Sequence, residues 1–114
     1  MSTQAFTLPV RLESTANKRE HHMARHRRAK GEREAAYLKC MWHEVPCTVT
    51  ITRIAPRALD SDNNVIAAKS VRDGIADRLG VKDNDPRILW LYDQRKGAPK
   101  EYAVHVKLWA DDPF

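Results

Sequence analysis

The side chains best suited to chemistry lie between residues 60 and 85 of this 114-residue chain. Asp60 and Asp62 flank one serine, so in an extended segment both carboxylates point to the same side. Asp83 and Asp85 form a second acidic cluster, and Lys69 lies between the two clusters. Carboxylates hold Mg²⁺ together with waters and a substrate phosphate, and a nearby lysine adds positive charge where the transition state becomes negative. This set therefore favours Mg²⁺-dependent hydrolysis of a phosphodiester, with Mn²⁺ as a substitute ion.

A helix is expected to carry Lys69 between the two acidic clusters. Asn63 and Asn64 precede a segment with apolar periodicity, and an Asp/Asn pair at such a place is typical of a helix start. Gly80 is expected to end this helix. Lys69 and Asp73 then lie one turn apart at the edge of its core face. That face is predicted to consist of Val65, Ala68, Ile75, Ala76 and Leu79.

Hydrophobic periodicity also predicts the remaining elements. Strands are expected over 6–12, 47–54 and 102–109, and the apolar segment 88–92 predicts a central strand. Pro9 favours a sheet edge for the first strand. A helix is expected over 34–45, with a packed face made of Tyr37, Leu38, Met41, Trp42 and Val45. The sequence thus predicts one α+β domain over 1–114, in the order β-α-β-α-β-β, with two helices against a small mixed sheet.

Charge and composition indicate a polyanionic partner. The chain has a net charge of +5 and a pI near 9.5, and its positive excess is concentrated between residues 17 and 33. We interpret this basic run as a phosphate-contacting arm, while a solvated helix face is the alternative. Its candidate DNA-binding residues are Lys18, Arg19, Arg25, Arg27, Arg28 and Lys30. No segment resembles a signal peptide or a membrane span, so we expect a cytoplasmic protein without a membrane partner.

The motif and the element order together resemble the RusA family of Holliday junction resolvases, which is common in bacteriophages and prophages. The residues that carry the resemblance are Asp60, Asp62, Asn63, Lys69, Asp73 and the cluster from Asp83 to Asp85, followed by Ile88. The resemblance implies a homodimeric, Mg²⁺-dependent endodeoxyribonuclease that resolves four-way DNA junctions by paired symmetric nicks, in recombination and repair or in phage DNA processing. It also implies that Asp60, Asp62, Lys69 and a later aspartate are the catalytic set, with Asn63 and Asp73 in support.

Two positions of the RusA-like motif, the lysine and the third carboxylate, differ in spacing or have more than one candidate. In the compact form of the motif the lysine follows the asparagine by three residues, whereas Lys69 follows Asn63 by six. The three additional residues advance a helix by about 300°, which leaves Lys69 within roughly 60° of the expected face. For the third carboxylate both Asp83 and Asp85 are kept, and Asp85 is preferred because of its spacing from the strand that begins at Ile88.

Two other functions remain open from the sequence. The acids could simply cap a helix and shape a turn in a basic nucleic-acid-binding module, since aspartate before a helix or a proline is ordinary turn chemistry. The chain could also be an assembly protein with a resolvase-like fold that has lost catalysis. Cleavage of a synthetic four-arm junction in Mg²⁺ separates these possibilities.

Overall fold

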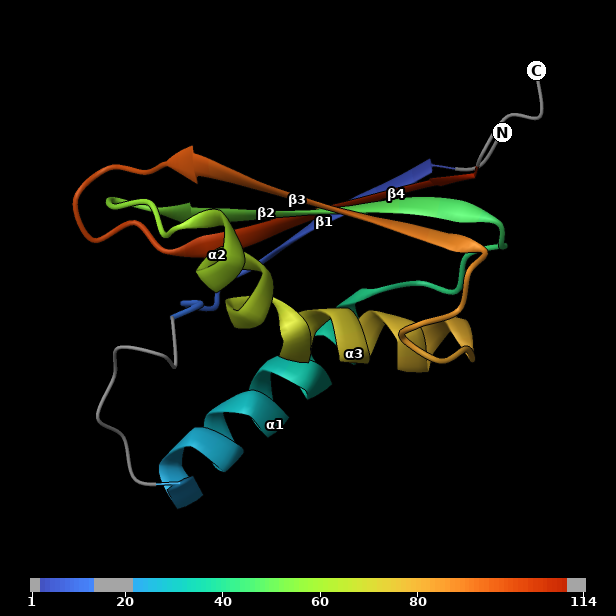
Figure 1. The fold of residues 1–114 in the computed structure, drawn as a ribbon, viewed down its shortest axis with the longest axis horizontal. Coiled ribbons are helices and arrows are strands. Elements are labelled where there is room, and N and C mark those ends of the chain that lie inside the picture. Colours follow the sequence, from blue (N-terminus) through green and yellow to red (C-terminus); the bar gives the residue numbers. More distant parts are fainter. Residues whose placement is uncertain (1–2, 14–21, 111–114) are drawn as a thin grey trace.

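The fold is a four-stranded mixed sheet with helices on one of its faces, as the computed structural model shows (Figure 1). The structure describes residues 3–13 and 22–110. Its elements, in chain order, are β1 (Thr3–Leu8), α1 (His22–Lys39), β2 (Cys47–Ala55), α2 (Ser61–Ala67), α3 (Lys69–Leu79), β3 (Ile88–Lys96) and β4 (Ala103–Ala110). The predicted α+β class with a mixed sheet is confirmed, but the described part of the chain has three helices instead of two.

The sheet has the order β1-β4-β2-β3, and β2 lies parallel to β3 while the other neighbours are antiparallel. A parallel pair needs a crossover connection, which α2 and α3 supply. The core lies between the helices and the central strands, where Val49, Ile51 and Val106 are at most 1% exposed. The position of β1 at an edge agrees with the expectation from Pro9.

The prediction of a central strand over 88–92 is wrong, because β3 is the other edge of the sheet. Its alternate residues Trp90 and Tyr92 pack against the core on the helix side. Leu89 and Leu91 point to the opposite face and are 55% and 41% exposed. The apolar character of both faces of this strand therefore comes from a bare sheet face and not from burial on both sides.

The predicted single helix from the Asp/Asn pair to Gly80 is observed as two. Ala68 is the last capping residue of α2 and the first of α3, with φ −84° and ψ −3°. Val65, which lies in α2 before this break, is 41% exposed, contrary to prediction. The rest of the predicted face is buried: Ala68, Ile75, Ala76 and Leu79. Gly80 ends α3 in the left-handed conformation at φ 72°, as predicted.

The first helix was predicted too late in the chain. It was expected over 34–45, but α1 spans His22–Lys39, so a large part of the basic run is helical. The expected packed face is also wrong for Leu38, Met41 and Trp42, which are 77%, 69% and 67% exposed, whereas Val45 packs against the core but lies beyond the end of the helix. Instead, α1 packs on α3 through small residues, with Ala36 buried beside Gly74.

Candidate functional site

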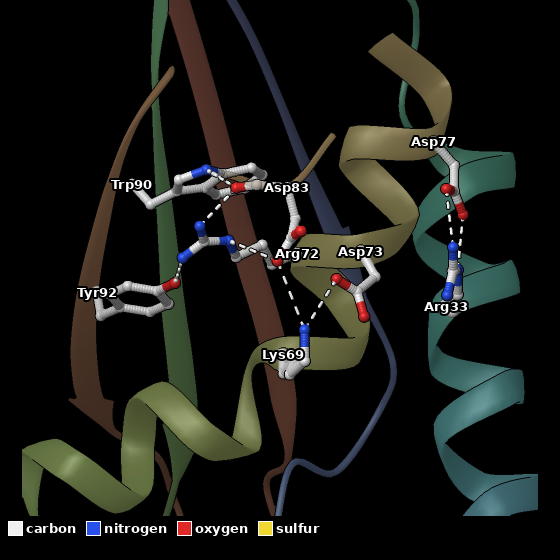
Figure 2. A network of polar contacts seen from close by, with 8 residues as sticks. All are labelled: Arg33, Lys69, Arg72, Asp73, Asp77, Asp83, Trp90 and Tyr92. Atoms are coloured by element: carbon white, nitrogen blue, oxygen red, sulfur yellow. Dashed lines mark hydrogen bonds and ion pairs between the residues drawn. The ribbon is translucent and has the colours of Figure 1, made fainter. Parts of the chain in front are cut away.

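Lys69 is the centre of the candidate site. It is the first residue of α3, directly after the break at Ala68. Its Nζ lies 3.4 Å from Asp73 Oδ1, one turn along the helix, and 3.5 Å from Asp83 Oδ2 in the loop between α3 and β3 (Figure 2). The predicted proximity of Lys69 and Asp73 is therefore confirmed. The structure further joins Lys69 to one member of the second acidic cluster, although the two residues are fourteen positions apart.

Arg72 holds the loop of Asp83 in place. Its Nη2 donates to the Asp83 carbonyl oxygen, and its Nη1 donates to the Tyr92 hydroxyl at 2.8 Å. The guanidinium lies over the Trp90 ring at 4.7 Å, and the indole Nε1 donates to the same Asp83 carbonyl at 3.1 Å. Figure 2 shows the guanidinium between the Trp90 and Tyr92 side chains, with its contacts to Tyr92 and Asp83 as dashed lines. The backbone of Asp83 is thus fixed by two donors, while its carboxylate is left 40% exposed beside Lys69.

These residues line an open hollow of about 490 Å³, here called the Lys69 hollow. Its polar lining consists of Arg33, Lys69, Asp73, Asp77, Lys82, Asp83 and Asn84. Arg33 reaches across from α1, and its Nε and Nη2 donate to the two Asp77 oxygens at 2.7 and 2.9 Å. This hydrogen bond to Asp77 raises the pKa of Arg33. The ion pair between Arg33 and Asp77 therefore links the basic helix α1 to the wall of the Lys69 hollow.

Asp85 is engaged differently from Asp83. One of its oxygens accepts from the Arg87 backbone N–H at 2.9 Å and from Arg87 Nε at 3.0 Å, and the other accepts from Nη2 at 2.8 Å. These hydrogen bonds with Arg87 lower the pKa of Asp85 to about 2. Such contacts over two residues are typical of an aspartate that shapes a turn. Asp83, not Asp85, is the acid that lies beside Lys69.

The first acidic pair lies at the start of α2. Asp60 occupies the N-cap position, but its side chain makes no capping hydrogen bond, and Asp62 is exposed in the first turn. Asn63 is half-buried, whereas Asn64 is 4% exposed and donates from Nδ2 to the Asp93 carbonyl at 3.3 Å. Asn63 was the predicted supporting residue, but Asn64 is the asparagine that is buried and bonded to β3. The burial of Asn64 holds α2 against β3 and so positions Asp60 and Asp62.

The predicted DNA-binding residues lie partly on α1. Arg25, Arg27 and Lys30 are exposed there, while the half-buried Arg28 lies 3.6 Å from Glu32. Lys18 and Arg19 lie outside the described residues. The helices of the described segments include none that is long and apolar enough to cross a membrane.

The acidic residues do not converge on one point. Within residues 3–13 and 22–110, no three His, Cys, Asp or Glu side chains lie together in a group that could hold a metal ion. Asp60 and Asp62 lie at the start of α2, whereas Asp73 and Asp83 share the Lys69 ammonium. Comparison with protein-family models and with curated proteins found no match to this chain.

Proposed function

We propose that the protein is a Mg²⁺-dependent, structure-selective endodeoxyribonuclease that resolves four-way DNA junctions by paired symmetric nicks. The observation that carries the proposal is the Lys69 ammonium, which lies between two carboxylates at the wall of an open hollow. A phosphate entering this hollow would meet a cation and metal-binding oxygens together. The resemblance of the motif to RusA resolvases supplies the substrate class.

The carboxylates around Lys69 suit a divalent ion. Asp73 and Asp83 already accommodate one positive charge between them, with contacts of 3.4 and 3.5 Å to Nζ. Mg²⁺ is usually held by one or two carboxylates together with waters and a substrate phosphate, so this pair meets the requirement. Asp60 and Asp62 would form a second acidic position at the start of α2. When bound, the ion would supply an activated water and stabilise negative charge on the phosphate oxygens.

The protein's own residues would orient the substrate and the acids. Lys69 would exchange its contact with a carboxylate for one with the scissile phosphate, where it stabilises developing charge. Arg72 would keep Asp83 at the hollow, because it holds the carbonyl of that residue and is itself held by Tyr92. We propose Asp83 as the third catalytic carboxylate, since both oxygens of Asp85 are engaged by Arg87.

The basic face of α1 would bind the arms of the junction. Its cations contact phosphates without reading sequence, which suits a substrate recognised by shape. Two symmetric cuts on a junction with a two-fold axis require two active sites, so we propose a homodimer that acts in the cytoplasm of a bacterial host. Sedimentation with and without junction DNA tests this, and a strict monomer at micromolar concentration in both conditions contradicts it.

The matched variants Asp83→Asn and Asp85→Asn test the site most directly. Each removes one carboxylate charge from the same loop. We expect Asp83→Asn to bind a synthetic four-arm junction without cutting it in Mg²⁺, and Asp85→Asn to cut at a rate close to that of the wild type. The reverse result would assign the third carboxylate to Asp85. If the wild type binds the junction and cuts nothing, the nuclease proposal fails.

The position of the ion can be measured without activity. Mn²⁺ broadens the NMR signals of nearby amides, so titration of the ¹⁵N-labelled protein reports which acids bind it. We expect the strongest broadening near Asp73 and Asp83, with a second set near Asp60 and Asp62. Uniform weak broadening along the chain would remove the metal site from the proposal.

A second candidate is a junction-binding protein without catalysis. It is favoured by one observation: Lys69 and Arg72 both lie within 4.0 Å of the Asp83 carboxylate, so the acid is neutralised by the protein itself. Junction binding that survives while Mg²⁺ and Mn²⁺ support no cleavage would select this function.

A further inference from the structure

A basic pocket lies at the carboxyl ends of the parallel strands β2 and β3, apart from the Lys69 hollow. It encloses about 250 Å³, and the charged side chains in its lining are Arg53, Arg57, Arg95 and Lys96. Ala55, Pro56, Ala58 and Gln94 complete the lining, which contains no acidic residue. Strand register brings the charges together, because Ile54 pairs with Arg95 and Ala55 pairs with Lys96. The pocket therefore concentrates positive charge that the lining does not neutralise.

Arg53 gives the pocket a buried cationic base, since the residue is 7% exposed. Its Nε donates to the Leu12 carbonyl at 2.9 Å, and its Nη1 donates to the Arg57 carbonyl at 2.7 Å and to Gln94 Oε1 at 3.5 Å. Among the described residues, the acceptors bonded to this guanidinium are all neutral oxygens. Burial lowers the pKa of Arg53, the charge of Arg11 adds to the effect, and the charges of Tyr102 and Glu13 oppose it. A buried cation held by neutral groups is stabilised when an anion binds beside it.

We propose that this basic pocket binds a phosphodiester group of a polynucleotide backbone. The volume suits one phosphate group, and guanidinium groups present paired donors that match its oxygens. The choice of DNA as the source of the phosphate rests on the proposed nuclease function, whereas the pocket as an anion site does not.

Gln94 links the basic pocket to the first acidic pair. Its Oε1 accepts from the Leu59 N–H and its Nε2 donates to the Leu59 carbonyl, both at 2.8 Å. The residue that lines the pocket thus fixes the backbone immediately before Asp60. A DNA strand held by one phosphate in the pocket would pass Asp60 and Asp62 at a set distance.

Paired charge removal tests the proposal in the full-length protein. Arg57→Gln with Lys96→Gln removes two exposed charges from the pocket, and Lys100→Gln with Lys107→Gln removes two exposed charges that lie outside both the pocket lining and α1. Binding of a fluorescent four-arm junction is measured over a range of salt concentrations. The pocket pair should lower the slope of log affinity against log salt by about one unit, as expected for one lost phosphate contact. Equal effects of the two pairs, or no effect of either, would overturn the proposal.

A second measurement does not depend on junction recognition. The Nε–H signal of Arg53 is followed by NMR during titration with a dinucleoside monophosphate, with inorganic phosphate, and with chloride at matched ionic strength. We expect the dinucleotide to shift this signal in the wild type and not in the pocket pair. A shift with the dinucleotide in a protein that neither binds nor cuts junctions supports the pocket and contradicts the proposed function. A response to inorganic phosphate alone, with an unchanged salt slope, overturns the assignment to a phosphodiester.

Discussion

Replacing Gly74 by alanine tests the contact that holds the basic helix α1 against α3. A Cβ at Gly74 would lie 2.2 Å from the Arg33 carbonyl oxygen and 2.8 Å from the Ala36 Cβ, and real Cβ atoms essentially never come closer than 3.0 Å to a neighbour. Because the closest atom belongs to the backbone, the two helices must separate by roughly 1 Å, at a cost of about 3 kcal/mol. Better helix propensity returns about 1 kcal/mol, which leaves a net loss of about 2 kcal/mol.

Gly31→Ala provides the matched control. Gly31 lies within α1, and a Cβ there would meet nothing within 4 Å. The same substitution should therefore stabilise the protein by about 1 kcal/mol through helix propensity alone. Urea unfolding followed by circular dichroism measures both variants, which should differ by about 3 kcal/mol. If Gly74→Ala is at least as stable as the wild type, the close approach of α1 and α3 is refuted.

The remaining predictions concern charge. Arg87 lowers the pKa of Asp85 to about 2, so this carboxylate stabilises the fold above its ordinary pKa of about 4 and loses that effect as the pH falls towards 2. Urea unfolding should show the largest stability difference between wild type and Asp85→Asn near neutral pH, and a constant difference down to pH 2 would contradict this assignment. Asp62→Asn should lose at most about 1 kcal/mol of stability and bind junctions without cutting them, whereas cleavage at the wild-type rate would remove Asp62 from the site. Replacing Arg25, Arg27 and Arg28 by alanine should flatten the salt dependence of junction binding by roughly one unit per lost phosphate contact, and unchanged binding would place the DNA elsewhere.

Local rules predicted the parts of the fold that depend on neighbouring residues. Gly80 ends its helix because the position is left-handed, and Lys69 meets Asp73 because residues four apart share a helix face. Strand positions followed from alternation, with shifts of a few residues at their ends. These features can be predicted without knowing which distant segments pack on the other side of the core.

The features that failed or were missed depend on distant segments. The apolar pattern of 88–92 is compatible with a central or an edge strand, and only the strand order decides between them. Leu89 and Leu91 are exposed because the helices cover the other face of the sheet. The contact between Lys69 and Asp83 depends on how a loop folds back, which Arg72 controls from α3. The basic pocket was not predicted, because its charges come from β2, from the segment that follows it and from β3, and the pairing register of the two strands cannot be read from either segment alone.

The position of β3 at the sheet edge has a consequence for the behaviour of the protein at high concentration. One side of this strand pairs with β2, and an outer strand offers backbone donors and acceptors to strands of other molecules. Its first half is apolar, with Leu89 and Leu91 exposed, while its second half carries Asp93, Arg95 and Lys96. Charges on an edge strand discourage intermolecular pairing, so the first half is where cross-β aggregation is expected to begin. A lysine in place of Leu89 or Leu91 should therefore slow aggregation without reaching the packed face of the sheet.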